Sequence, residues 1–101
     1  MNDLLLHNYF DALVNRFYKI LPMREQDEPY LDLYMQSFRN ELLGCNNCIE
    51  NDAMLMTLVS ILQYLIDHQD VPVSEVKREV FRAISVCNKL KDKYSVEGVQ
   101  I

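Results

Sequence analysis

The stretch from residue 53 to 66, AMLMTLVSILQYLI, constrains the fold more than any other part of the sequence. Wound at 3.6 residues per turn, its apolar side chains cover a face wider than the roughly 100° stripe of an ordinary surface helix. Neighbours must therefore cover such a helix on two or three sides. The apolar face consists of Met54, Leu55, Leu58, Val59, Ile61, Leu62, Leu65 and Ile66, and the polar side of Thr57, Ser60, Gln63 and Asp67. The pattern predicts a central hydrophobic helix at about 52–68, capped by Asn51 or Asp52. A membrane span would need about 20 predominantly apolar residues.

Three further amphipathic segments can pack against this central helix. The first is expected from residue 2 or 3 to about 21, where Pro22 and the residues after it stop it. The second is capped by Asp27 or Glu28, has Pro29 in its first turn and ends at a left-handed Gly44. The last runs from Ser74, its N-cap, to residue 94. Their core stripes are Leu6, Phe10, Leu13, Val14, Phe17, Ile20 and Leu21; Leu31, Tyr34, Met35, Phe38 and Leu42; and Val76, Val80, Ala83, Ile84, Cys87, Leu90 and Tyr94.

These helices predict an all-α fold, a four-helix antiparallel bundle with short loops. Connections of about 4–9 residues favour antiparallel neighbours. Only two glycines occur in 101 residues, and half of the residues are hydrophobic, a composition typical of packed helices. We expect one helical-bundle domain over residues 1–94 and a flexible C-terminal tail over 95–101.

The charge and the cysteine content limit the partners and the compartment. The formal net charge is −5 and the pI about 4.8, which argues against nucleic acid and anionic membrane surfaces as partners. No secretory signal is visible, because the first ten residues lack a basic region and interrupt their apolar run with His7 and Asn8. Three cysteines, an odd number, fit a reducing environment. The expected localisation is cytoplasmic.

The motif Cys45-Asn-Asn-Cys48, in a polar turn expected at 45–51, is the one pattern that could indicate metal or redox chemistry. A zinc site needs about four ligands, and no second such pair accompanies it. Cys87 lies on a core stripe, and His7 and His68 stand alone in the sequence. We interpret the cysteines as structural or incidental, with a metal site and a redox pair as the alternatives.

Nothing in the sequence forms a catalytic pattern. The carboxylates lie outside the apolar stretches that would raise a pKa for acid–base work. A nucleophile elbow, a glycine-rich phosphate loop and a HExxH motif are all missing from the sequence. We therefore expect no enzyme, no catalytic residue, no cofactor and no metal.

The last helix carries a charge asymmetry. Residues 1–75 contain twelve acidic and four basic residues, whereas residues 76–101 contain three acidic and six basic ones. The cations could simply complement the helix dipole and pair with the acidic helices beside them. Alternatively, they surround an apolar anchor and form a docking face for an acidic partner or for a second copy. The candidate partner-binding residues are Arg78, Phe81, Arg82, Lys89 and Lys93.

The sequence therefore predicts a small acidic helical protein-interaction module, an adaptor, inhibitor or regulatory subunit. The alternative is a DNA-binding transcriptional regulator that uses the basic helix 74–94, although the turn before it is long for a helix-turn-helix. Met56 and Tyr64, on the polar side of the central helix, indicate a further contact surface such as a homodimer seam. No small-molecule substrate is inferred.

Overall fold

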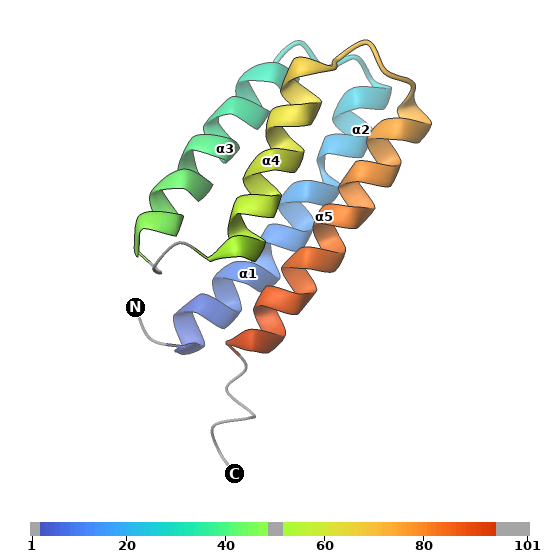
Figure 1. The fold of residues 1–101 in the computed structure, drawn as a ribbon. Coiled ribbons are helices and arrows are strands. Elements are labelled where there is room, and N and C mark those ends of the chain that lie inside the picture. Colours follow the sequence, from blue (N-terminus) through green and yellow to red (C-terminus); the bar gives the residue numbers. More distant parts are fainter. Residues whose placement is uncertain (1–2, 49–51, 95–101) are drawn as a thin grey trace.

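The computed structural model describes residues 3–48 and 52–94, which form five α-helices. They are α1 (Asp3–Tyr18), α2 (Ile20–Glu25), α3 (Leu31–Cys48), α4 (Ala53–Asp67) and α5 (Val73–Lys93). α1 and α2 follow each other in one direction, and α3, α4 and α5 then alternate in direction beside them (Figure 1). The described residues contain no strand. The predicted all-α, four-helix antiparallel bundle is confirmed, with α1 and α2 together forming the first helix. The predicted tail, 95–101, lies outside the described residues.

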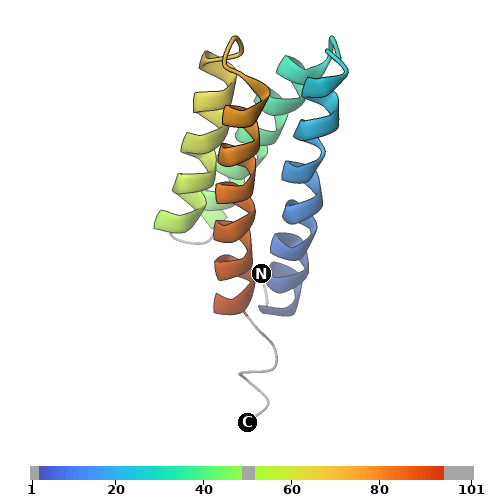
Figure 2. The ribbon, with the colours of Figure 1, turned by 90° about the vertical axis from the view of Figure 1, so that its right-hand side faces the viewer.

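The order of the helices around the bundle places α5 between α4 and α1 (Figure 2). α4 in turn packs against α3. Side chains close the bundle between α1 and α3, where the ring centroids of Phe17 and Phe38 lie 4.7 Å apart. The Tyr34 hydroxyl also donates a hydrogen bond to the Arg16 carbonyl oxygen at 2.8 Å.

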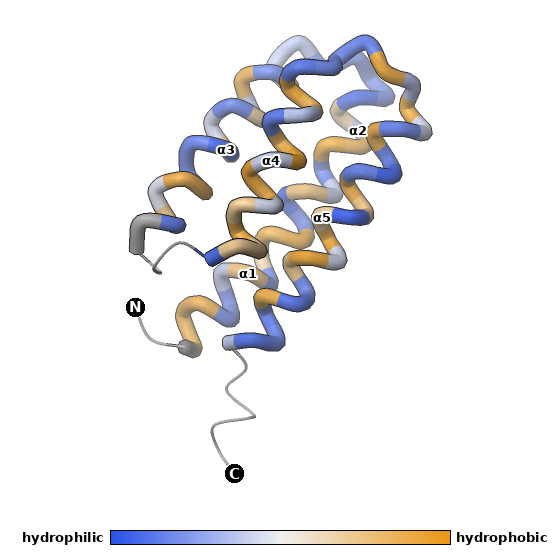
Figure 3. Tube along the Cα trace, in the orientation of Figure 1, coloured by the Kyte–Doolittle hydropathy of each residue, from blue (hydrophilic) through white to orange (hydrophobic). Residues whose placement is uncertain are grey.

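One hydrophobic core runs through all five helices. Hydrophobic and hydrophilic segments alternate along the helices (Figure 3), as expected where each helix buries one side. Phe10, Phe17 and Phe38 are the bulkiest fully buried side chains. The predicted core stripes are confirmed: Leu6, Phe10, Leu13, Phe17, Ile20, Leu21, Leu31, Met35, Phe38, Leu42, Val76, Val80, Ala83, Cys87 and Leu90 are buried, and Val14, Tyr34, Ile84 and Tyr94 are half-buried against them.

The predicted central helix is confirmed as α4. Asp52 is its N-cap, and its carboxylate accepts hydrogen bonds from the backbone N–H groups of Met54 at 2.8 Å and Leu55 at 3.4 Å. These bonds satisfy donors that the first turn of a helix otherwise leaves without partners. Six apolar side chains of α4 are buried, and Ser60 and Asp67 on its polar side are exposed.

Pro22 does not stop the first helix, contrary to the sequence prediction. It lies inside α2, and the regular helix is interrupted upstream, at Lys19. Proline lacks an N–H group, and its ring collides with the carbonyl four residues earlier, here that of Tyr18, the last residue of α1. The backbone stays nearly helical through Lys19, at φ −59° and ψ −24°. Pro22 therefore interrupts the regular helix at Lys19, and the chain continues in the same direction as α2.

The cap predicted for the second helix is also wrong. Asp27 terminates α2, since its φ of 51° is left-handed. The N–H of Glu28 bonds to the Met23 carbonyl at 2.9 Å, and that of Asp27 to the Arg24 carbonyl at 3.2 Å. This pair of bonds is the Schellman motif, in which aspartate is tolerated in place of glycine. α3 begins at Leu31, after a turn that contains Pro29.

Gly44 does not end the second predicted helix. No glycine among the described residues has a positive φ, and α3 continues through Gly44 to Cys48. The predicted polar turn at 45–51 is therefore helical over residues 45–48, and the rest of that segment lies outside the described residues. Cys45 and Cys48 lie on the last turn of α3.

Ser74 does not cap the last helix. Pro72 occupies the N-cap position of α5 with an extended backbone, at φ −61° and ψ 154°. Its carbonyl accepts hydrogen bonds from the N–H groups of Glu75 at 2.9 Å and Val76 at 3.2 Å. Because the extended ψ of Pro72 places it outside the helix, the helix begins with the next residue, and Ser74 lies inside the first turn. Glu75 also lies in the first turn, where its negative charge complements the helix dipole.

Candidate interaction surface

The five candidate residues of the last helix, Arg78, Phe81, Arg82, Lys89 and Lys93, are all exposed on α5. They do not form one site. Lys93 lies at the C-terminal end, where its ammonium group contacts the Asp52 carboxylate at the start of α4. Arg78, Phe81 and Arg82 lie near the other end of α5, within about one helical turn of each other.

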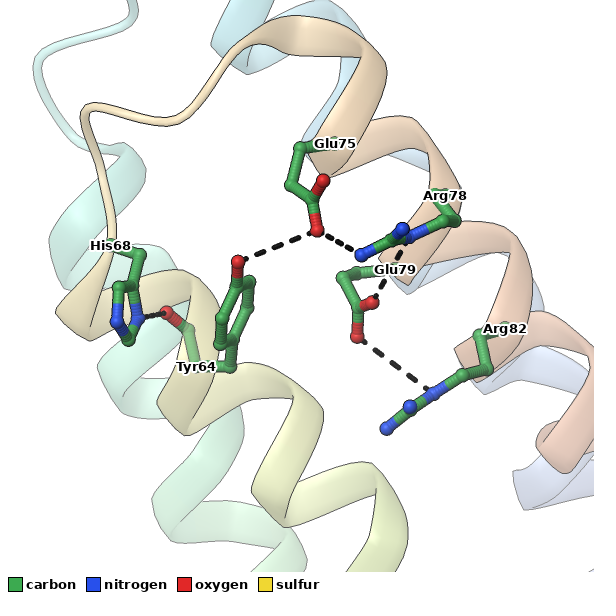
Figure 4. Close-up of polar contacts among 6 residues, drawn as sticks. All are labelled: Tyr64, His68, Glu75, Arg78, Glu79 and Arg82. Atoms are coloured by element: carbon green, nitrogen blue, oxygen red, sulfur yellow. Dashed lines mark hydrogen bonds and ion pairs between the residues drawn. The ribbon is translucent and has the colours of Figure 1, made fainter.

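A nearly buried carboxylate organises the two arginines. Glu79 is only 8% exposed, although it carries a charge. One of its oxygens lies 3.6 Å from Nε of Arg78, and the other lies 3.8 Å from Nε of Arg82 (Figure 4). Glu75 contacts a terminal nitrogen of Arg78 and also accepts a hydrogen bond from the Tyr64 hydroxyl at 3.4 Å. The carboxylates thus lie beneath the arginines, between α4 and α5.

The guanidinium groups remain accessible despite these contacts. The side chains of Arg78 and Arg82 are 68% and 56% exposed. Arg82 contacts Glu79 through Nε, and its two terminal nitrogens have no partner among the described residues. A guanidinium in this state can still donate two parallel hydrogen bonds to a carboxylate or a phosphate.

An exposed aromatic pair borders the arginines on the α1 side of α5. The rings of Phe81 and Tyr18 meet edge to face, with centroids 6.1 Å apart and an interplanar angle of 76°. Both rings remain open to solvent, with Phe81 43% and Tyr18 52% exposed. Arg78 is three residues before Phe81 and four before Arg82, so it lies between them on the helix surface. We call Tyr18, Arg78, Phe81 and Arg82 together the docking patch.

Sequence reasoning missed two members of this arrangement. Tyr18 is placed by the pairing of α1 with α5, which the periodicity of neither helix reveals. Glu79 could have been found, because it lies three residues after Val76 and four before Ala83, both on the core stripe. That spacing places a carboxylate at the edge of the core.

The remaining cations of α5 divide into paired and unpaired ones. Lys91 lies 3.3 Å from the Asp11 carboxylate on α1, and Lys93 pairs with Asp52. The hydrogen bond from Lys93 to Asp52, rather than the opposing effect of burial, raises the pKa of Lys93. Lys77 and Lys89 form no ion pair with the described residues. The prediction that cations pair with neighbouring acidic helices therefore describes Lys91 and Lys93 but not the docking patch.

The second predicted surface lies around Met56 and Tyr64, and its two side chains differ in exposure. Met56 is 38% exposed. Tyr64 is half-buried, stacks on His68 with ring centroids 4.4 Å apart, and bonds to Glu75. Tyr64 therefore connects α4 with α5, and only Met56 offers an apolar side chain to solvent there.

A second polar cluster links α1 with α3. Glu41 accepts hydrogen bonds from the Tyr9 hydroxyl at 2.6 Å and from Arg16 at 2.5 Å. Burial, reinforced by Glu41, raises the pKa of the Tyr9 hydroxyl. Burial alone would raise the pKa of Glu41, but the hydrogen bonds from Arg16 and Tyr9 outweigh it and lower that pKa. These shifts hold tyrosine neutral and glutamate charged, which fits a structural link between two helices.

The described His, Cys, Asp and Glu residues do not lie together in a way that would bind a metal ion. Among the described residues, no group of three or more His, Cys, Asp or Glu is placed to hold a metal ion. Both histidines lie within 3.0 Å of a backbone carbonyl through Nδ1, His7 at Lys91 and His68 at Tyr64. A hollow of about 40 Å³ near Arg24 and Leu31 is lined mainly by core residues, and holds at most a water molecule or two.

Two further findings complete the description of the chain. None of the described helices combines the length and the apolar character that crossing a bilayer requires. No protein-family model, curated protein or solved structure matches the chain significantly.

Proposed function

We propose that this protein is a small acidic helical protein-interaction module that binds a protein partner through the docking patch and has no catalytic activity of its own. The observation that supports the proposal most directly is the exposed Tyr18–Phe81 pair next to Arg78 and Arg82. Aromatic and arginine side chains dominate the residues that contribute most to protein–protein binding. Here Arg78, Phe81 and Arg82 lie on α5, whose opposite side is buried in the core, and Tyr18 of α1 contacts Phe81.

The charge distribution supports a protein partner over DNA. Residues 75–89 contain four basic and two acidic side chains, so the local excess of positive charge is small. A DNA-binding helix needs a wide basic surface, since several phosphates must be neutralised at once. Lys93 and Lys91, which would extend the basic surface along α5, are engaged with Asp52 and Asp11. The proposed setting is the cytoplasm, because an odd number of cysteines fits a reducing compartment.

Affinity purification with quantitative mass spectrometry, from cells that express the chain, tests the proposal. The test variant is Phe81→Ala with Arg82→Glu. The control is Leu33→Ala with Ser37→Glu, which removes an exposed apolar side chain and adds one negative charge on α3. We expect at least one partner that the native chain and the control retain and that the test variant loses by tenfold or more. Partners retained equally by all three proteins would contradict the choice of surface.

The DNA alternative predicts a different result in a second assay. Fluorescence anisotropy with duplex DNA should then show binding that weakens steeply as salt rises. We expect no binding even at low salt. Light scattering separates a homodimer from binding to another protein, because a homodimer would have twice the 11.9 kDa mass of one chain.

A further inference from the structure

We draw no further inference here: the strongest candidate, the surface hollow of about 370 Å³ that Asp27, Glu28 and Asp32 line between the turn after α2 and the turn after α4, is a cluster of acidic residues, and nothing in the structure shows which ligand or partner would occupy it.

Discussion

Replacement of Asp52 is the sharpest test of how the bundle is held together at the end where α4 begins. The side chain is nearly buried, with 7% of the residue exposed. It accepts hydrogen bonds from the backbone N–H groups of Met54 and Leu55, and it also contacts the ammonium group of Lys93 on α5. One carboxylate thus caps one helix and links it to the end of another.

The expected cost of each substitution follows from these separate interactions. Removing an N-cap side chain costs about 1 kcal/mol. The negative charge at the N-terminus of α4 adds about 0.5 kcal/mol. The ion pair adds about 0.5 kcal/mol, because the Lys93 side chain is 49% exposed and solvent screens it. Asp52→Ala should therefore destabilise the protein by about 2 kcal/mol, and Asp52→Asn, which still caps the helix, by about 1 kcal/mol.

Urea denaturation followed by circular dichroism measures both variants. A loss of 2 kcal/mol corresponds to a fall in Tm of roughly 8–16 °C for a domain of this size. A double-mutant cycle with Lys93→Met isolates the ion pair, with an expected coupling of about 0.5 kcal/mol that diminishes in high salt. Equal stabilities of Asp52→Ala and the native protein, or a coupling of zero at low salt, would refute this account.

The pH dependence gives an independent check. Burial of Asp52 would raise its pKa, but the hydrogen bonds from Lys93 and from the backbone outweigh this effect and lower the pKa below its ordinary value of 3.8. A carboxyl group whose pKa is lower in the folded than in the unfolded state stabilises the protein above the unfolded value, and loses that contribution as pH falls through the folded value. The stability difference between native protein and Asp52→Asn should therefore be full at pH 7 and smaller at pH 3.

Three further predictions concern single side chains. Gly44→Ala should stabilise the protein by about 1 kcal/mol in urea denaturation, because Gly44 is helical and an added Cβ meets no atom within 4 Å; destabilisation would contradict the helical assignment. Phe38→Ala should destabilise it by about 4 kcal/mol, since Phe38 is fully buried against Phe17 and beneath the Arg16 guanidinium; a melting curve with a loss under about 1.5 kcal/mol would refute this. Burial raises the pKa of the Cys87 thiol to about 12, so peptide mapping should find Cys87 unmodified by iodoacetamide at pH 8 until the chain unfolds; labelling of the folded protein would contradict its burial.

The periodicity of apolar residues was sufficient to predict the bundle, whereas the local stop signals were misleading. Pro22 and Gly44 are both typical of helix ends, yet both lie inside helices. Their effect depends on what surrounds them. A proline can lie inside a helical segment when the regular helix is interrupted a few residues upstream. A helical glycine costs only about 1 kcal/mol, which the packing of the flanking core residues outweighs.

The docking patch could be predicted only in part, for a related reason. Arg78, Phe81 and Arg82 lie within about one turn of one helix, so the helical period places Arg78 beside each of the other two. Tyr18 comes from another helix, and its contact with Phe81 depends on which helices are neighbours and on their relative height. The periodicity of a single helix does not reveal which helix lies beside it or at what relative height.

The pairing of the basic residues determines which of them remain available for binding. Lys91 and Lys93 reach acidic residues on other helices, Asp11 and Asp52, and these contacts join parts of the bundle. Arg78 and Arg82 pair with carboxylates of their own helix, so their ion pairs are not needed to join α5 to its neighbours. A partner that contacts Arg78 or Arg82 would therefore not disrupt an ion pair between two helices. A surface for reversible binding is therefore expected among the arginines and not at the lysine end of α5.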